Sequence, residues 1–304
     1  MLTLLARRVV RLVVVLAGVT LVTFAILHVS GDPVSLMMPE APEADRVTLR
    51  QAMGFNEPLP IQFARFLANT ARGNFGNSFF HRAPALSLVL DRMPTTLLLT
   101  VLAMGLSLSI AVPIGILSAV RRNSVFDHGA TFVVFLGTSM PVFWTGIMLI
   151  LLFAVQLRVL PVSGWESWTA LVLPTLTLAT AATPLLLRIV RSSMLEVINL
   201  DYVRTARAKG VSEWLVICHH ALVNAALPLV TVAGLQFGLL LGGAIITETV
   251  FAVPGLGRLI VGAIRQLDFP IVQAGVFVLA LIVVLVNFAV DLLYIYLNPQ
   301  IRVR

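Results

Sequence analysis

The chain has 304 residues, of which 59% are hydrophobic and only 12% are charged, and its mean hydropathy is +0.98. Soluble domains carry about 25% charged residues, and this chain has too few to cover the surface of a soluble protein of its size. It is therefore predicted to be a membrane protein. Its formal net charge of +7 does not indicate a nucleic-acid partner, because Lys and Arg collect in the cytoplasmic loops of membrane proteins. The single Cys218 excludes an internal disulfide and a Cys-based metal cluster.

Six apolar segments are long enough to cross a bilayer as helices, which takes about 20 residues each. An apolar run begins the chain after Arg7, Arg8 and Arg11, and we interpret it as part of a retained first span because no small-residue cleavage site follows it. The sequence thus predicts an all-α polytopic protein with six transmembrane helices. The predicted spans are residues 9–29, 95–119, 130–157, 170–187, 227–250 and 274–297.

The distribution of Lys and Arg predicts the orientation, because these residues favour the cytoplasmic side of the termini and short loops. The short loops of one side hold only Arg158, Arg258 and Arg265. Both termini and residues 188–226 are therefore expected in the cytoplasm, and residues 30–94 outside. The basic residues on the expected cytoplasmic side are Arg7, Arg8, Arg11, Arg121, Arg122, Arg188, Arg191, Arg204, Arg207, Lys209, Arg302 and Arg304.

Two segments outside the spans belong to what is predicted to be a single transmembrane domain over residues 1–304. Residues 30–94 carry both signs of charge and predict a small folded cap, with an apolar patch over residues 61–71 that favours a helix. The inner segment, residues 188–226, predicts a helix from Ser193 to Lys209 that ends at Gly210. Ser212 is then expected to cap a second short helix that runs through His220.

Catalytic constellations are not found in the sequence, which disfavours a membrane enzyme. There is no G-x-x-x-x-G-K-[ST] loop to bind phosphates. His219 and His220 are adjacent and so point in different directions on a helix, which disfavours a metal site. We expect no cofactor and no metal.

The polar residues in the middle of the spans are chiefly uncharged, which disfavours a proton-coupled carrier. Gln236 and Asn287 could line a pore, although hydrogen bonding between helices is the commoner use of such residues. Gly234, Gly238 and Gly242 follow one another at intervals of four and lie on one face of the fifth span. Such a face allows close approach of another helix, either within the chain or along a subunit interface.

The cytoplasmic segment over residues 201–210 reads D-Y-V-R-T-A-R-A-K-G. It resembles the coupling motif E-A-A-x-x-x-G of binding-protein-dependent ABC importer permeases. Ala206 and Gly210 match that motif, whereas Arg204 stands at its Glu position and Thr205 at its first Ala. In the element that follows, Leu222 fits the later Leu, but a Val stands where Pro is expected. The segment is closer to the dipeptide/oligopeptide branch of this family.

The resemblance extends along the chain. It includes motifs at residues 31–34, 92–97, 248–257 and 290–294, and one departure at residues 298–300. It implies a type I ABC importer permease fold, a bacterial inner (plasma) membrane location, and contact with membrane lipid. It also implies a second homologous permease, two cytoplasmic ATPase subunits and an external substrate-binding protein as partners.

By this resemblance residues 188–226 form the coupling loop, and peptides of the dipeptide/oligopeptide class are the expected substrate. Nickel chelates, glutathione or haem, which related permeases move, remain alternatives, as does an autonomous carrier or channel. The residues expected to couple to the ATPase are Arg204, Thr205, Ala206, Arg207, Lys209, Gly210, Val211, Ser212, Trp214 and Leu222.

Overall fold

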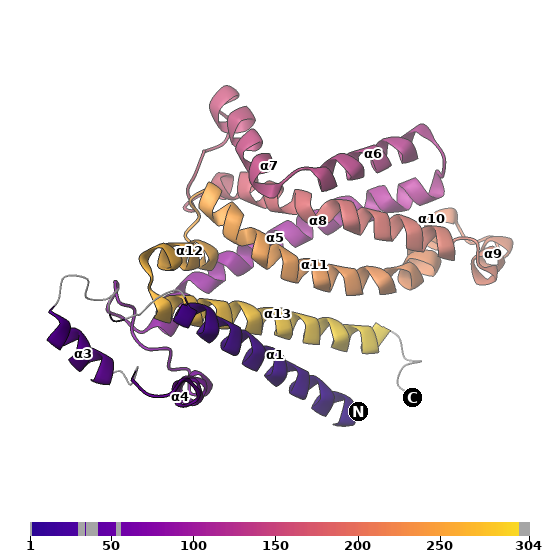
Figure 1. The fold of residues 1–304 in the computed structure, drawn as a ribbon. Helices are drawn as coiled ribbons and strands as arrows, with labels where there is room; N and C mark the ends of the chain where they lie inside the picture. Colours follow the sequence, from indigo (N-terminus) through magenta and orange to yellow (C-terminus); the bar gives the residue numbers. More distant parts are fainter. Residues whose placement is uncertain (1, 30–33, 35–41, 53–55, 298–304) are drawn as a thin grey trace. The chain divides into compact units, whose positions relative to one another are not determined.

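The computed structural model describes residues 2–29, 34, 42–52 and 56–297. Within these residues the chain is almost entirely helical, and its one pairing of extended residues is an isolated bridge between Asn77 and Pro84. The predicted all-α class is confirmed. The helices, drawn in Figure 1, are α1 (Leu2–Val29), α3 (Glu43–Ala52), α4 (Leu59–Ala71), α5 (Ala85–Val120), α6 (Val125–Ser139), α7 (Val142–Leu149), the π-helical η1 (Ile150–Gln156), α8 (Trp168–Val197), α9 (Asp201–Ala208), α10 (Glu213–Leu215), the π-helical η2 (Val216–Ala221), α11 (Leu222–Val250), α12 (Leu256–Gln266) and α13 (Phe269–Leu297).

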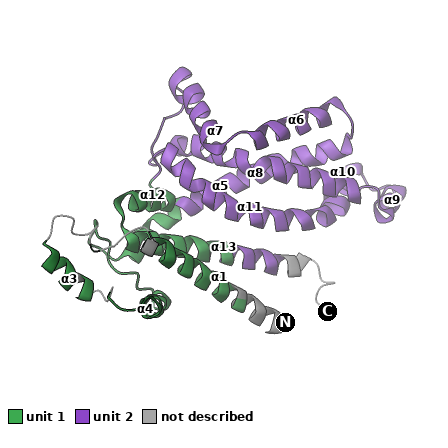
Figure 2. Cartoon of the chain, viewed as in Figure 1, with its two compact units in different colours: residues 1–95, 254–284 green, residues 96–253, 285–304 purple. Residues whose placement is uncertain are grey.

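The chain divides into two compact units, coloured separately in Figure 2. Unit 1 consists of residues 1–95 and 254–284, and unit 2 of residues 96–253 and 285–304. The motif residues 31–33 and 298–300 lie outside the part of the chain that the structure describes.

Unit 1 is held together by aromatic and aliphatic side chains. The ring of Phe24 in α1 lies edge-on to Phe63 and stacks on Phe66, both in α4, with centroids 5.3 and 5.8 Å apart. The helix predicted around residues 61–71 is therefore present as α4, and its apolar face packs against α1. At the other side of the unit, a Cβ placed on Gly275 of α13 would lie 2.6 Å from Ile260 of α12, so these two helices touch closely.

Unit 2 is built around α8, which contacts α6, α7 and α11. The helix begins at Ser167, whose hydroxyl accepts the N–H of Ala170 at 3.4 Å and so satisfies one free donor of the first turn. A Cβ on Gly115 of α5 would lie 2.8 Å from Val190. A Cβ on Gly137 of α6 would lie 2.9 Å from a carbon of the Pro184 ring. Glycine is needed at both places because α8 leaves no room for a side chain.

The six predicted spans all fall on helices of the structure. The first lies on α1, a helix of 28 residues whose described apolar stretch is Leu12–Ile26. The third lies on the bent pair α6 and α7–η1. Among the described residues, four helices are long and apolar enough to cross a membrane: Ala85–Val120, Trp168–Val197, Glu213–Val250 and Phe269–Leu293.

The third predicted span, residues 130–157, is interrupted at Pro141. The two helices on either side of this residue are bent by 104°. Proline has no N–H to continue the helix, and its ring forces the preceding residue out of the helical region. Met140 is accordingly extended, with φ −95° and ψ 124°. Counted as one span, the bent pair makes a fifth candidate for membrane crossing.

Candidate coupling segment

The first helix of the inner segment is shorter than the sequence predicts. The single helix expected from Ser193 to Lys209 is wrong, because α8 ends at Val197 and α9 begins only at Asp201. Leu200 between them is extended, with φ −72° and ψ 152°. Asn199 and Asp201 flank this break, and both residue types favour helix ends over helix interiors because their side chains compete for backbone hydrogen bonds. The break separates α9 from α8.

The predicted turn at Gly210 is confirmed. Gly210 has φ +76°, the left-handed conformation that glycine adopts without a steric penalty. Its N–H donates to the carbonyl of Arg207 at 2.9 Å, and the N–H of Val211 donates to the carbonyl of Ala206 at 3.3 Å. These two bonds form a Schellman motif, which satisfies the last carbonyls of α9 and reverses the chain toward α10.

Ser212 occupies the N-cap position that the sequence predicts, but its hydroxyl makes no capping hydrogen bond. The expected side-chain cap is therefore wrong. The Ser212 carbonyl instead accepts the N–H of Val216 at 3.0 Å. The second helix is also longer than expected, because α10 and η2 continue without a break into α11.

A small apolar cluster lies between the two arms of the segment. Val203, Ala206 and Val216 are buried, and Val197 and Val211 pack against them. Valine on one arm thus contacts valine on the other, which stabilises the hairpin without help from a partner protein. Each buried valine contributes roughly 1.5 to 3 kcal/mol.

Polar contacts brace the outer side of the same hairpin. The Arg207 guanidinium donates to both carboxylate oxygens of Glu213, at 2.7 and 3.1 Å, and to the Ile198 carbonyl at 3.4 Å. The hydrogen bond to Glu213 raises the pKa of Arg207 above its ordinary value. The amide of Asn224 donates to the Tyr202 hydroxyl at 2.9 Å. An exposed ion pair is worth about 1 kcal/mol or less, so these contacts orient the arms more than they stabilise them.

The outward surface of the segment combines cations with apolar side chains. Trp214 is 75% exposed and Leu215 is 51% exposed, and the cations Arg204 and Lys209 are exposed as well. Tryptophan and arginine are the residues that most often dominate the energy of protein interfaces. This surface is suited to bind a partner protein.

The residues predicted for coupling fall into three groups by exposure. Ala206 is buried in the cluster and Val211 is half-buried beside it, whereas Leu222 is half-buried against the main core of unit 2. The exposed members are Arg204, Thr205, Arg207, Lys209, Gly210, Ser212 and Trp214.

The residues predicted on the fifth and sixth spans are not gathered in one place. Gly234 is buried against α13, and a Cβ there would lie 2.5 Å from a side-chain carbon of Val290. Gly238 is half-buried, whereas Gly242 is exposed and a Cβ there would meet nothing within 4 Å. Gln236 is 7% exposed and Asn287 is half-buried. Gly234 and Gly242 therefore do not share one packing partner among the residues that the structure describes.

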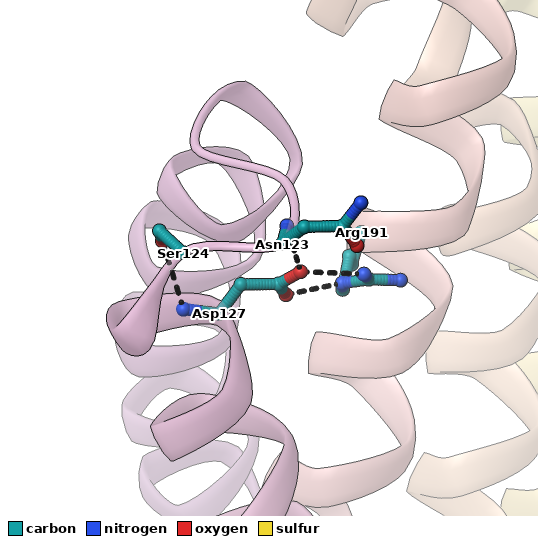
Figure 3. A network of polar contacts seen from close by, with 4 residues as sticks. All are labelled: Asn123, Ser124, Asp127 and Arg191. Carbon is teal, nitrogen blue, oxygen red and sulfur yellow. Dashed lines mark hydrogen bonds and ion pairs between the residues drawn. The ribbon is translucent and has the colours of Figure 1, made fainter.

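Sequence reasoning missed an ion pair that joins α6 to α8 (Figure 3). The carboxylate of Asp127, 2% exposed, accepts two hydrogen bonds from the Arg191 guanidinium at 2.6 and 2.7 Å. It also accepts the backbone N–H of Asn123 at 3.0 Å, and the Asp127 N–H donates to the Ser124 hydroxyl at 3.2 Å. The available signal was an acidic residue just before a predicted span, where it can lie in the first turn of a helix.

Comparison with known proteins links these features to a family. The profile described as binding-protein-dependent transport system inner membrane component matches residues 111–303, and that of the N-terminal part of such membrane components matches residues 1–100. The chain is 40% identical to the dipeptide transport system permease protein DppB of Escherichia coli (strain K12), over 99% of both chains. It is also 40% identical to the glutathione transport system permease protein GsiC of Salmonella paratyphi A, over 100% of both chains.

A solved structure shares the fold. The chain superposes on an inward-facing conformation of the MetNI methionine ABC transporter with a TM-score of 0.59 and 22% sequence identity, covering 69% of this chain and 96% of that chain. At this level of identity the likeness concerns the arrangement of helices.

Proposed function

The chain belongs to the binding-protein-dependent transport system inner membrane component family, and from this premise we propose that it carries short peptides across the inner membrane. It is a multi-pass permease of an ABC importer, and ATPase subunits and a binding protein are its partners by family. We further propose that it pairs with a second, different permease, and that its termini and residues 188–226 face the cytoplasm. The pathway then lies between the two permeases.

One observation carries the mechanism we propose: the hairpin of α9, α10 and η2 has its own apolar cluster and exposes Trp214 and two cations. A hairpin braced in this way loses little conformational entropy on docking. ATP-driven movement of a docked ATPase is then transmitted through the hairpin to α11, which continues from it, and through the turn at Leu200 to α8. The driving free energy comes from the different affinities of the motor for the two states.

The chain itself is proposed to have no ATPase activity. Phosphate binding in ATPases of this kind needs a glycine-rich loop with a lysine, and the full sequence has no such loop. The energy is thus supplied from outside the chain.

The proposed substrate class rests on the relatives. DppB is named for dipeptides, and GsiC is named for glutathione, which is itself a small peptide. Both names fit a short peptide carrying a free carboxylate. Glutathione is accordingly the second candidate within the same class.

The test is reconstitution of the chain with its permease, ATPase and binding-protein partners in lipid vesicles. We expect uptake of a labelled dipeptide that requires ATP and the binding protein, together with binding-protein-stimulated ATP hydrolysis. A chain purified free of other subunits should not hydrolyse ATP. Uptake that persists without the ATPase subunits would contradict the proposal and favour an autonomous carrier.

A further inference from the structure

Unit 1 contains a cavity of about 390 Å³ beside helix α12. One face of α12 forms its wall through Gly255, Arg258, Gly262 and Gln266, which recur every three or four residues and so lie in a row. A second wall comes from His81, on the loop after α4, and Arg92, in the first turns of α5. The volume lies within the range of about 300 to 1,000 Å³ typical of small-ligand sites.

The polar lining of this cavity consists of hydrogen-bond donors that favour an anion. Two guanidinium groups, those of Arg92 and Arg258, line the cavity together with the His81 imidazole and the Gln266 amide. Among the residues that the structure describes, the ten that line the cavity include no aspartate or glutamate. A guanidinium presents paired N–H groups that match the two oxygens of a carboxylate. The lining therefore suits a carboxylate better than a neutral group.

The wall that carries His81 is fixed by buried hydrogen bonds. The Ser78 hydroxyl donates to the Asp268 carboxylate and accepts the N–H of His81 at 2.9 Å. Ser78 is 2% exposed and Asp268 is fully buried at the corner between α12 and α13. Arg92 in turn donates to the carbonyl of Pro254, 3.5 Å away. Both walls are thus attached to the segment that contains α12, which fixes their spacing before any ligand arrives.

The floor of the cavity is apolar and open. Leu259, Ala263 and Ile271 line it. At Gly262 a Cβ would meet nothing within 4 Å, so the glycine leaves free space on the cavity wall. A ligand with a carboxylate beside an apolar side chain would place its charge between the arginines and its side chain on this floor.

We propose that this cavity binds the terminal carboxylate of a short peptide. The inference rests on the proposed peptide substrate, but not on the coupling mechanism. Residues 30–94 and the loop before α12 are expected outside the membrane, so the cavity would receive peptide on the side from which import begins. Arg92 and Arg258 hold the carboxylate, and the floor accepts the last side chain.

The experiment measures binding to the full-length chain in phosphatidylcholine nanodiscs, without ATPase subunits. The probe is N-acetyl-alanyl-leucine, compared with its carboxamide and with N-acetyl-aspartate amide, which carries only a side-chain carboxylate. We expect saturable binding of the free acid, at least tenfold weaker binding of both amides, and weak competition by inorganic phosphate. Equal binding of acid and carboxamide overturns the proposal, as does no saturable binding. Stronger binding of the aspartate probe or of phosphate shows that the cavity takes a protein side chain or a lipid headgroup instead.

Two variants and a control locate the binding. Arg258→Gln should weaken binding of the free acid at least tenfold. Gly262→Leu should abolish binding, because its side chain would fill the open space where a Cβ meets nothing within 4 Å. Arg265→Gln removes the same charge from the same helix, away from the cavity lining, and should bind normally. If Arg258→Gln and Arg265→Gln weaken binding of the acid equally, the effect comes from the net charge of the chain and the proposed site is wrong. Because no ATPase is present, such a failure leaves the permease assignment intact.

Discussion

At the scale of single residues, Gly210 allows the effect of its backbone conformation to be tested separately from steric effects of its neighbours. Its φ of +76° disfavours any residue with a side chain, by roughly 1 kcal/mol, but a Cβ there meets nothing within 4 Å. The strain of a substitution in the isolated chain is therefore conformational. A steric or charge effect arises only when a partner protein covers the turn.

We expect Gly210→Asn and Gly210→Arg to behave differently. Asparagine tolerates the left-handed conformation better than other residues with a side chain. Gly210→Asn should thus keep most of the binding-protein-stimulated ATP hydrolysis in the reconstituted importer. Gly210→Arg adds strain and a long cation, and should lose stimulation while its membrane abundance stays normal. If both variants are stimulated normally and support uptake, this turn is not part of the motor interface.

The ion pair between Asp127 and Arg191 is the second feature that acts at this scale. Removing one partner leaves a desolvated charge, which costs about 3 to 5 kcal/mol for a fully buried pair. Arg191 is 28% exposed, so the cost should fall toward the lower end or below it. Asp127→Asn and Arg191→Gln should each lower the thermal stability of the purified chain.

A double-mutant cycle separates the pair from its surroundings. The double variant Asp127→Asn, Arg191→Gln should be less destabilised than the sum of the two single variants, by about 1 to 3 kcal/mol. Additive losses would mean that the two side chains act independently, against the geometry of Figure 3.

At the scale of helices, the glycines of α11 separate into different roles. Gly234→Leu would insert a side chain where Val290 already lies 2.5 Å from an ideal Cβ. Overpacking of this kind costs about 1 to 3 kcal/mol, so we expect reduced stability of the isolated chain. Gly242→Leu has free space and should leave that stability unchanged, while weakening co-purification of the second permease if this face lies in the interface.

Comparing the two variants by thermal unfolding of the isolated chain and by permease co-purification tests that assignment. Gly238 lies between these positions and is half-buried, so Gly238→Leu should have an intermediate effect on stability. A loss of stability in Gly242→Leu that equals the loss in Gly234→Leu would show that the face has been assigned wrongly.

The helices also show which features a linear pattern can predict. The apolar length predicted where the long helices lie, and the basic last turn followed by glycine predicted the end of α9. The break at Leu200 was missed because residues 193–209 contain no Gly or Pro to mark it, and because the packing of Val203 on Val216 is a contact between separate arms. The predicted side-chain cap at Ser212 was wrong for a similar reason. The preference of serine for N-cap positions predicts where the helix begins, but the capping hydrogen bond depends on the local geometry.

At the scale of the whole molecule, the orientation in the membrane can be tested directly. In a Cys218→Ser background, Ala68→Cys in α4 and Ser212→Cys should react with membrane-impermeant thiol reagents from opposite sides. Both positions are exposed. Ser78 is less suitable as an outer position, because it is buried and bonded to Asp268. Reaction of both cysteines from outside intact cells would refute the six-span arrangement.

The fold class and family followed from composition and ordered motifs, because both depend on the chain as a whole. The ion pair and the cavity of unit 1 did not. Asp127 and Arg191 are 64 positions apart, and the walls of the cavity come from segments separated by more of the chain than that. One sequence contains no signal that pairs such distant residues, so these features required the folded arrangement.

The separation of Asp127 and Arg191 also has a consequence for biogenesis. Ribosomes add about 5 to 20 residues per second, so the 64 residues between the two take about 3 to 13 s to synthesise. Over that interval the Asp127 carboxylate has been translated and its guanidinium partner has not. We expect the first turn of α6 to remain hydrated at the cytoplasmic surface until α8 is translated. The ion pair then fixes α6 against α8. We therefore expect the third span to complete its insertion only after the fourth span has been translated.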